Sequence, residues 1–335
     1  MQSTSQAQFD AVEHATIPDL ELVRPGIWSL PLALPDNHIP FSLCYIVVST
    51  SGAAHLIDPG WNSDDNWLRM TLALDQLGAS MSDVASVVST HLHPDHLGLA
   101  ERVRAASGAS VALHHIEQTA LTAMNGNFVP ASAEKFEEWG VPQDRRAEMS
   151  LARKSADLMP DFVADRLLED GELLALGELE LTVIRTPGHT SGHICLQSRE
   201  LGLIFTGDHV LPTIFSGLGL GGRSESNPLA DYFDALDALA TFDDHEVCPG
   251  HGYRFFGLNE RCEALFEHHL RRSREVAAII IATPNATVWE VASQISWTDG
   301  WHNLQGFYLQ SALSQSAMHR QFVATEAGQS RLSTR

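Results

Sequence analysis

The chain has 335 residues, of which 44% are hydrophobic, so it is long enough to bury a sizeable core in one large domain or two smaller ones. Its formal net charge of -21 argues against a broad phosphate-binding surface, because nucleic-acid affinity rests largely on lysine and arginine. Nucleic acid is therefore disfavoured as a partner. The four cysteines have no CxxC spacing, so neither a disulfide framework nor a cysteine zinc cluster is indicated.

The N-terminal residues 1–20 contain no basic start followed by an apolar segment, and no later stretch approaches about 18 uninterrupted apolar residues. We therefore expect a cytoplasmic protein without a membrane partner. A small-molecule substrate is the expected partner, and a homodimer is an open alternative to a monomer.

Short apolar runs separated by turn residues predict strands in the first part of the chain. The pattern is β-rich at the start and α/β afterwards. Strands are predicted over 26–34, 41–50, 53–60, 84–90 and 110–115, with helices over 66–78 and 97–106.

Residues 117–170 break this rhythm, since they are polar and helical with no strand pattern. One interpretation is an ordinary surface insertion. The other is a lid beside an active site, which long excursions between scaffold elements often form.

Strand patterns resume at 179 and give way to helices after 252. Three helices and a closing hairpin over 322–334 would outline a small winged-helix-like unit. The predicted strands are 179–186, 193–198, 201–208 and 245–252, and the predicted helices are 258–280, 287–295 and 306–321.

The segment "THLHPDH" places His91, His93, Asp95 and His96 on a loop directly after a predicted buried strand. Two histidines one residue apart can point the same way in extended backbone, and Pro94 biases His93 toward that conformation. One loop thus offers four ligands in two adjacent pairs, enough to start two neighbouring metal sites. The alternative is a solvated polar loop.

Three later segments supply further candidate ligands, each at the end of a strand and flanked by glycine. They are "TPGHTSGH" with His189, "TGDH" with Asp208 and "PGHG" with His251. Imidazole and carboxylate ligands suit zinc, iron, manganese or cobalt. Five histidines and two aspartates are what a two-metal hydrolytic site needs, because an aspartate can bridge the ions and a shared water can be deprotonated near neutral pH.

The order "HLHPDH", "TPGHTSGH", "TGDH", "PGHG", with "LIDPGW" upstream, resembles the metallo-β-lactamase-fold hydrolase superfamily over residues 22 to about 255. The resemblance implies an α/β fold, an αββα sandwich, with the glyoxalase II-like ligand set. By this resemblance His91, His93 and His189 hold one metal. Asp95, His96 and His251 hold the second, and Asp208 bridges the two.

Three further residues are expected to support these ligands. Asp58 matches an acidic residue of the superfamily that steadies the metal loop without binding metal. His193 and His209 lie close in sequence to proposed ligands, and we interpret them as groups that orient ligands or contact substrate.

The resemblance also predicts the domain organisation. Residues 1–21 form an N-terminal extension, and residues 22–255 form the catalytic domain, with the insertion at 117–170. Residues 256–335 resemble the winged-helix-like appendage found in one branch of the superfamily.

The expected activity is hydrolysis with two divalent metal ions, zinc first, with iron or manganese as alternatives. A metal-bridging hydroxide would attack the substrate, with Asp208 between the ions, and Asp95 or a metal-bound water would handle the proton of the leaving group. True β-lactamases carry cysteine or a second histidine where this chain has Asp208, so antibiotic hydrolysis is disfavoured.

The favoured substrate is a thioester, ester or lactone with an apolar portion. Phe128, Phe136, Trp139 and Phe162 of the insertion could line an apolar mouth, and the acidic composition disfavours polyanions. No individual substrate-binding residue follows from the sequence. Three alternatives stay open: a phosphodiesterase or endoribonuclease, a mononuclear-iron sulfur dioxygenase, and a non-enzymatic DNA-binding or oligomerisation module.

Overall fold

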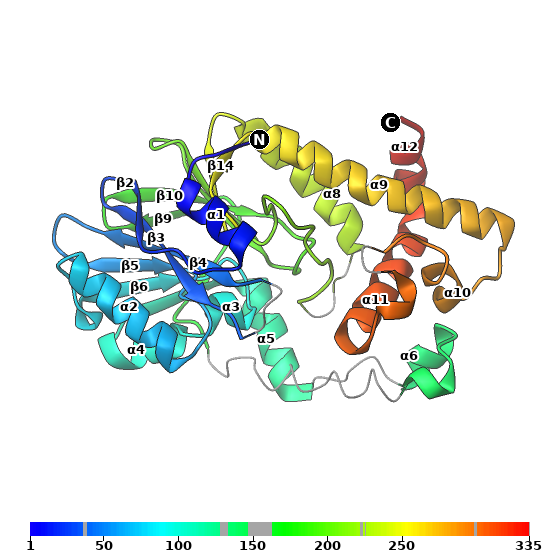
Figure 1. Ribbon diagram of the computed structural model, residues 1–335, viewed down its shortest axis with the longest axis horizontal. Helices are drawn as coiled ribbons and strands as arrows, with labels where there is room; N and C mark the ends of the chain where they lie inside the picture. The colour runs from blue at the N-terminus through cyan, green and yellow to red at the C-terminus, as the bar shows by residue number, and fades with distance from the viewer. Residues whose placement is uncertain are drawn as a thin grey trace.

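The computed structural model describes residues 1–35, 39–127, 133–146, 163–221, 224, 226–297 and 300–334. At its centre two mixed seven-stranded sheets lie against each other, with helices on both outer faces (Figure 1). This is the αββα sandwich that the sequence predicts, and the prediction of the fold class is confirmed.

The first sheet has the order β2-β3-β4-β5-β6-β7-β8. It is antiparallel as far as β5, and β5 to β8 run parallel. The carboxyl ends of β5, β6 and β7 therefore lie along one edge. The strands are β2 (Glu21–Arg24), β3 (Ile27–Ala33), β4 (Phe41–Val48), β5 (Ala54–Ile57), β6 (Val84–Val88), β7 (Ser110–His114) and β8 (Arg166–Leu168).

The second sheet has the order β1-β14-β13-β12-β11-β10-β9, in which β12 and β13 run parallel. Its edge strand β1 comes from the very start of the chain and pairs with β14. The strands are β1 (Gln2–Ser3), β9 (Leu173–Leu176), β10 (Leu179–Arg185), β11 (Ile194–Ser198), β12 (Leu203–Gly207), β13 (Glu246–Pro249) and β14 (Phe255–Phe256).

Strand β4 shows how the sequence builds two cores at once. Its alternate residues Phe41, Leu43 and Tyr45 pack between the sheets, whereas Cys44 and Ile46 pack against the outer helices. Because both faces are buried, the strand is apolar almost throughout. The helices near this face are α2 (Asp64–Gln76), α3 (Pro94–Leu97), α4 (Ala100–Ser107) and α5 (His115–Asn127), with the 3-10 turn Met81–Asp83.

The outer face of the second sheet is covered by α8 (Pro228–Leu239) and the first half of α9 (Leu258–Ala282). Phe233 of α8 and Phe266 of α9 pack in one cluster with Ile204 of the sheet. The 3-10 turn Ala240–Phe242 follows α8, and α1 (Gln6–His14) is the first helix of the chain.

The chain after β14 is helical, and the hairpin expected over 322–334 is wrong. Helix α12 occupies Glu326–Thr334, where Arg331 forms ion pairs with Asp234 and Asp237 of α8. No strand occurs among the described residues beyond Phe256, so the predicted wing is absent from that part. The other elements are α10 (Val288–Ala292), the 3-10 turn Trp301–Asn303 and α11 (Gly306–Val323). None of the described helices is long and apolar enough to cross a membrane.

The middle of the insertion, residues 133–146, packs on these C-terminal helices, whereas its two described ends pack on the first sheet. Helix α6 (Ala133–Glu138) lies beside α10 and α11 in Figure 1, and its Phe136 is buried with Trp139 in one cluster with Leu309 and Leu313. The expectation that these two aromatic residues line an apolar mouth is therefore wrong. Phe128 and Phe162 lie outside the described residues. The insertion also ends in strand β8, which its polar sequence did not predict.

Candidate metal centre

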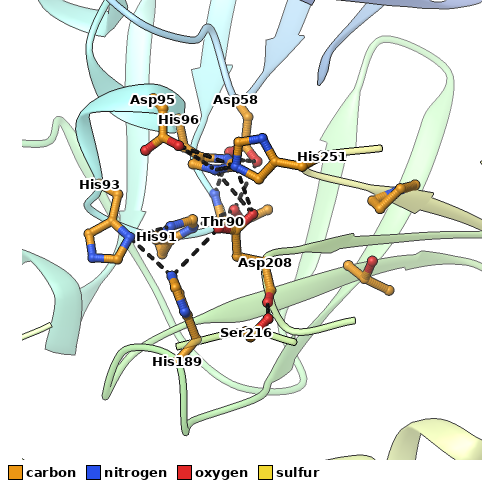
Figure 2. A network of polar contacts seen from close by, with 12 residues as sticks. Asp58, Thr90, His91, His93, Asp95, His96, His189, Asp208, Ser216 and His251 are labelled. Atoms are coloured by element: carbon orange, nitrogen blue, oxygen red, sulfur yellow. Dashed lines mark hydrogen bonds and ion pairs between the residues drawn. The ribbon is translucent and has the colours of Figure 1, made fainter. Parts of the chain in front are cut away.

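All seven candidate ligands meet at the edge of the sandwich where the parallel strands end (Figure 2). Each lies in the chain just after a strand, because a strand end holds the backbone rigidly while the following loop can turn the side chain inward. The loop after β6 carries His91 and His93, and Asp95 and His96 lie in the short helix α3 rather than on the loop as predicted. His189 follows β10, Asp208 follows β12 and His251 follows β13.

The first cluster consists of three histidines. Nδ1 of His93 lies 3.0 Å from Nε2 of His91 and 3.0 Å from Nε2 of His189. These ligand atoms all fall within 4.8 Å of one another, as candidate ligands of one ion do.

The outer nitrogens of two of these rings face backbone carbonyls. His93 Nε2 lies 3.2 Å from the Leu220 oxygen, and His189 Nδ1 lies 2.7 Å from the Gly217 oxygen. A carbonyl oxygen only accepts, so the proton of each neutral ring lies on its outer nitrogen. The inner nitrogens therefore present lone pairs to one another.

The proton of His91 is also placed on its outer nitrogen, here by a hydroxyl group that in turn donates to a carboxylate. Thr90 Oγ1 donates to Asp58 at 2.8 Å and so can accept from His91 Nδ1 at 3.0 Å. Burial lowers the pKa of His91 well below its ordinary value and that of His189 to about 4, which keeps both rings neutral at pH 7. Three neutral imidazole rings whose lone pairs face one another can bind one cation, so these residues fit a metal site.

The second cluster mixes imidazole with carboxylate. His251 Nε2 lies 3.2 Å from Asp95 Oδ2 and 3.2 Å from His96 Nε2. Burial opposes a charge on His251, but the carboxylates of Asp208 and Asp95 prevail and raise its pKa to about 10. Without metal, protons on these rings balance the carboxylates. A divalent cation fits the same position.

Asp208 lies between the two clusters. Its Oδ1 is 3.2 Å from His96 Nε2 and 3.3 Å from His251 Nε2, and its Oδ2 is 3.7 Å from His189 Nε2. Burial opposes the charge, but the neighbouring His251 and His96 hold the pKa of Asp208 well below its usual range. One ionised carboxylate thus points one oxygen toward each cluster, which is the geometry that a bridging ligand requires.

Asp58 supports the loop of candidate ligands from beneath. Its carboxylate accepts from the Thr90 N–H at 2.7 Å and from Ser89 Oγ at 3.2 Å, and it lies 3.0 Å from His96 Nδ1. It adopts a φ of 53°, in the left-handed region that a non-glycine residue seldom enters. These contacts are those of an outer residue that orients a ligand.

The other two predicted supporting residues differ from each other. His193 Nε2 accepts from the backbone N–H of Asp208 at 3.2 Å, and its Nδ1 lies 2.9 Å from Thr186 Oγ1. The ring of His209 packs instead against His193 and Tyr232, at 5.7 and 4.6 Å between ring centres. Both histidines are fully buried, so neither is exposed for contact with a substrate.

Glycine is needed at the centre for space as well as for turning. A Cβ on Gly250 would lie 2.5 Å from Asp208 Oδ1 and 2.6 Å from His96 Cε1. Gly207 adds a positive φ of 46° to a similar lack of room beside Thr90. Any side chain at Gly250 would therefore displace Asp208.

One buried residue at the centre was missed by the sequence reasoning. Glu117, in the first turn of α5, accepts from the backbone N–H groups of Leu92 and Gly192. Burial raises the pKa of Glu117 to about 7, although these two hydrogen bonds act in the opposite direction. The available signal was only a single acidic residue two positions after the predicted strand 110–115, with Ile116 as its one apolar neighbour.

Residues 40–251 match the sequence model of the metallo-beta-lactamase superfamily. Among curated relatives, the chain is 27% identical over 267 residues to the probable metallo-hydrolase YqjP of Bacillus subtilis (strain 168), which covers 76% of this chain and 82% of that protein. It is 32% identical to a hydroxyacylglutathione hydrolase of Albidiferax ferrireducens, over 70% of this chain and 69% of that protein. It is also 29% identical to the acyl-coenzyme A thioesterase MBLAC2 of Gallus gallus, over 56% of this chain and 62% of that protein.

The fold resembles that of a solved metallo-beta-lactamase family protein from Thermus thermophilus. The TM-score is 0.74 at 26% identity, and the match covers 90% of this chain and 94% of the other. Because only a tenth of this chain lies outside the match, the similarity extends into the C-terminal helical region.

Proposed function

The chain belongs to the metallo-beta-lactamase superfamily, and from this we propose that it is a binuclear metallohydrolase acting on a thioester, ester or lactone with an apolar portion. The observation that carries the proposal is the position of Asp208. Its Oδ1 lies 3.3 Å from His251 Nε2 and its Oδ2 lies 3.7 Å from His189 Nε2, so that one carboxylate faces both candidate ligand clusters.

The donor set suits two divalent cations. We expect Zn²⁺, and the same imidazole and carboxylate donors also accept iron or manganese. When bound, such ions supply an activated water and neutralise negative charge that develops on the substrate oxygen. In this proposal His91, His93 and His189 hold one ion, Asp95, His96 and His251 hold the other, and Asp208 contacts both.

Asp95 is the best-placed group for proton transfer. Its side chain is 24% exposed, compared with 11% for Asp208, so it is the more accessible of the two carboxylates. Burial opposes the charge, but the adjacent His96 and His251 hold the pKa of Asp95 below its usual range. The carboxylate is therefore ionised at pH 7, and in this proposal Asp95 or a metal-bound water handles the proton of the leaving group.

The substrate class is supported by the surroundings and by two relatives. The loop that supplies the Gly217 and Leu220 carbonyls also exposes Ile214 and Phe215, at 37% and 45%. A small cavity lined in part by Ile214, Ile39 and Pro40 reaches His251. One relative is named an acyl-coenzyme A thioesterase and another is named a hydroxyacylglutathione hydrolase.

The test is a substrate panel on protein of known metal content. Metal per chain is measured by elemental analysis, and turnover is measured on acyl-coenzyme A, glutathione thioester and lactone substrates. We expect two ions per chain and turnover of at least one substrate well above that of the metal-stripped protein.

Three results would contradict the proposal. The first is no turnover above the metal-stripped control. The second is one iron per chain with oxygen consumption in the presence of a persulfide, which identifies a sulfur dioxygenase. The third is RNA cleavage with an affinity that falls steeply as salt rises, which identifies a nuclease.

A further inference from the structure

Glu117 connects the two loops that carry the first cluster of candidate ligands. Its Oε2 accepts from the Leu92 N–H at 2.9 Å, and its Oε1 accepts from the Gly192 N–H at 2.7 Å. Leu92 stands between His91 and His93, and Gly192 follows His189 by three positions. One side chain therefore ties the loop after β6 to the loop after β10.

The contact with the second loop is close. A Cβ on Gly192 would lie 2.7 Å from the Glu117 nitrogen, 2.8 Å from Ile116 Cβ and 2.9 Å from Glu117 Oε1. The loop backbone is thus pressed against the first turn of α5, and only glycine leaves room for it. The position of the loop is set by Glu117 and by the absence of a side chain opposite it.

The chemistry of this link requires a carboxylate. Each of its two oxygens accepts one backbone N–H, whereas a glutamine of the same length offers one acceptor and one donor. Glu117 is fully buried, and burying a carboxylate is costly unless its oxygens are hydrogen-bonded. A residue that serves only to fill space at this position would be apolar.

We propose that Glu117 is a positioning residue that sets the spacing between His91 and His93 on one loop and His189 on the other. It thereby controls metal affinity at the first cluster and leaves the second cluster unaffected. This inference rests on the proposed function, because it requires that these three histidines bind a metal ion.

The experiment compares metal binding by the full-length wild type and Glu117→Gln. Metal-free protein is titrated with Co²⁺ and followed by visible absorption, and Zn²⁺ affinity is measured by competition with a chelator. The variant His189→Ala identifies the absorption band of the first site. The matched control is Glu246→Gln, since Glu246 is an equally buried carboxylate that pairs with Arg254 at 2.6 Å rather than with either loop.

We expect Glu117→Gln to weaken the first site by about ten- to a hundred-fold and to leave the second site and the control at wild-type affinity. Wild-type affinity at both sites of this variant overturns the inference. A similar loss of metal affinity at both sites, together with a lower free energy of unfolding of the metal-free protein, also overturns the inference, because that result indicates a general structural role. If Glu117→Gln does not fold, the same titration is made on Gly192→Ala, which moves the loop and leaves the carboxylate intact. Its affinity at the first site then tests the inference.

Failure of the proposed function gives a different result. A wild-type protein that binds no Co²⁺ or Zn²⁺ overturns both the metal centre and the inference. A wild type that binds two ions but hydrolyses none of the panel contradicts only the proposed activity, since the role of Glu117 is measured by affinity.

Discussion

Replacing Asp58 by asparagine should change which nitrogen of His96 carries the proton. Asp58 Oδ1 accepts from the Thr90 N–H at 2.7 Å, and its Oδ2 lies 3.0 Å from His96 Nδ1. In Asp58→Asn the amide oxygen takes the place facing Thr90, because an N–H cannot accept. The amide nitrogen then donates to His96 Nδ1 and moves the ring proton to Nε2, the atom that faces Asp208 at 3.2 Å.

The expected cost follows from the loss of one ligand lone pair at the second cluster. Changing the outer partner of a ligating histidine costs about ten- to a hundred-fold in metal affinity, or about 1.4–2.7 kcal/mol. The first cluster should lose affinity as well, because Thr90 Oγ1 donates to the same Asp58 oxygen at 2.8 Å and accepts from His91 Nδ1 at 3.0 Å, and an amide NH2 at that place cannot accept from the hydroxyl.

The assay is competition for Zn²⁺ with a chromophoric chelator, which resolves two affinities per chain. A suitable control is Asp244→Asn, since Asp244 is an exposed carboxylate that lies 2.6 Å from Nδ1 of the buried His245. Two wild-type affinities in Asp58→Asn would refute the reasoning, as would an equal loss in the control.

Other expectations concern activity, packing and pH. Asp208→Ala should abolish hydrolysis and the binding of at least one ion, and full activity with both ions retained would refute its bridging position. Phe233→Ala should lower the free energy of unfolding, measured by chemical denaturation, by about 3–5 kcal/mol, because the ring is buried against Phe266 and Phe322. The control Leu72→Ala, at an exposed site, should change it by less than about 0.5 kcal/mol. Burial lowers the pKa of His319 from 6.5 to about 3, so below pH 6.5 the proton binds the unfolded chain in preference to the folded one. At pH 5 this preference lowers the free energy of unfolding by about 2 kcal/mol. His319→Gln should remove that loss relative to wild type in unfolding measured with chelator at pH 7 and pH 5, and parallel curves would contradict this.

The membership of the candidate centre was predictable because each candidate ligand belongs to a motif at a strand end. A short run such as "HLHPDH" specifies both the residues and the local backbone that carries them. The structure brings this run together with His189, Asp208 and His251, as the sequence predicts. Their roles as ligands stay a prediction until metal is measured.

The supports of the centre were harder to predict, since many of them are backbone groups. The outer nitrogens of His93, His189 and His251 face the carbonyls of Leu220, Gly217 and Phe41, and every residue type carries a carbonyl. Such partners leave no mark in the sequence. Glu117 leaves only a faint one, because a lone acidic residue in a helix is usually exposed.

The C-terminal helices illustrate the limits of local pattern. Residues 322–334 mix apolar and polar residues in a way that suits a strand, but Arg331 reaches Asp234 and Asp237 on α8 and lies over the ring of Phe233. These long-range contacts select a helix over a hairpin. Helix α8 itself begins with an Asn227 cap and Pro228, a start signal that was available in the sequence.

The loop between Asp208 and Leu220 orients two histidines through its backbone alone. It should therefore accept many substitutions, since the Gly217 and Leu220 carbonyls remain whatever side chains replace Ile214 or Phe215. It should not accept a change of length, because one inserted or deleted residue moves both carbonyls away from His189 and His93. The side chains at this edge of the centre can thus be changed by substitution, whereas the number of residues in the loop is fixed by the two histidines that its backbone holds.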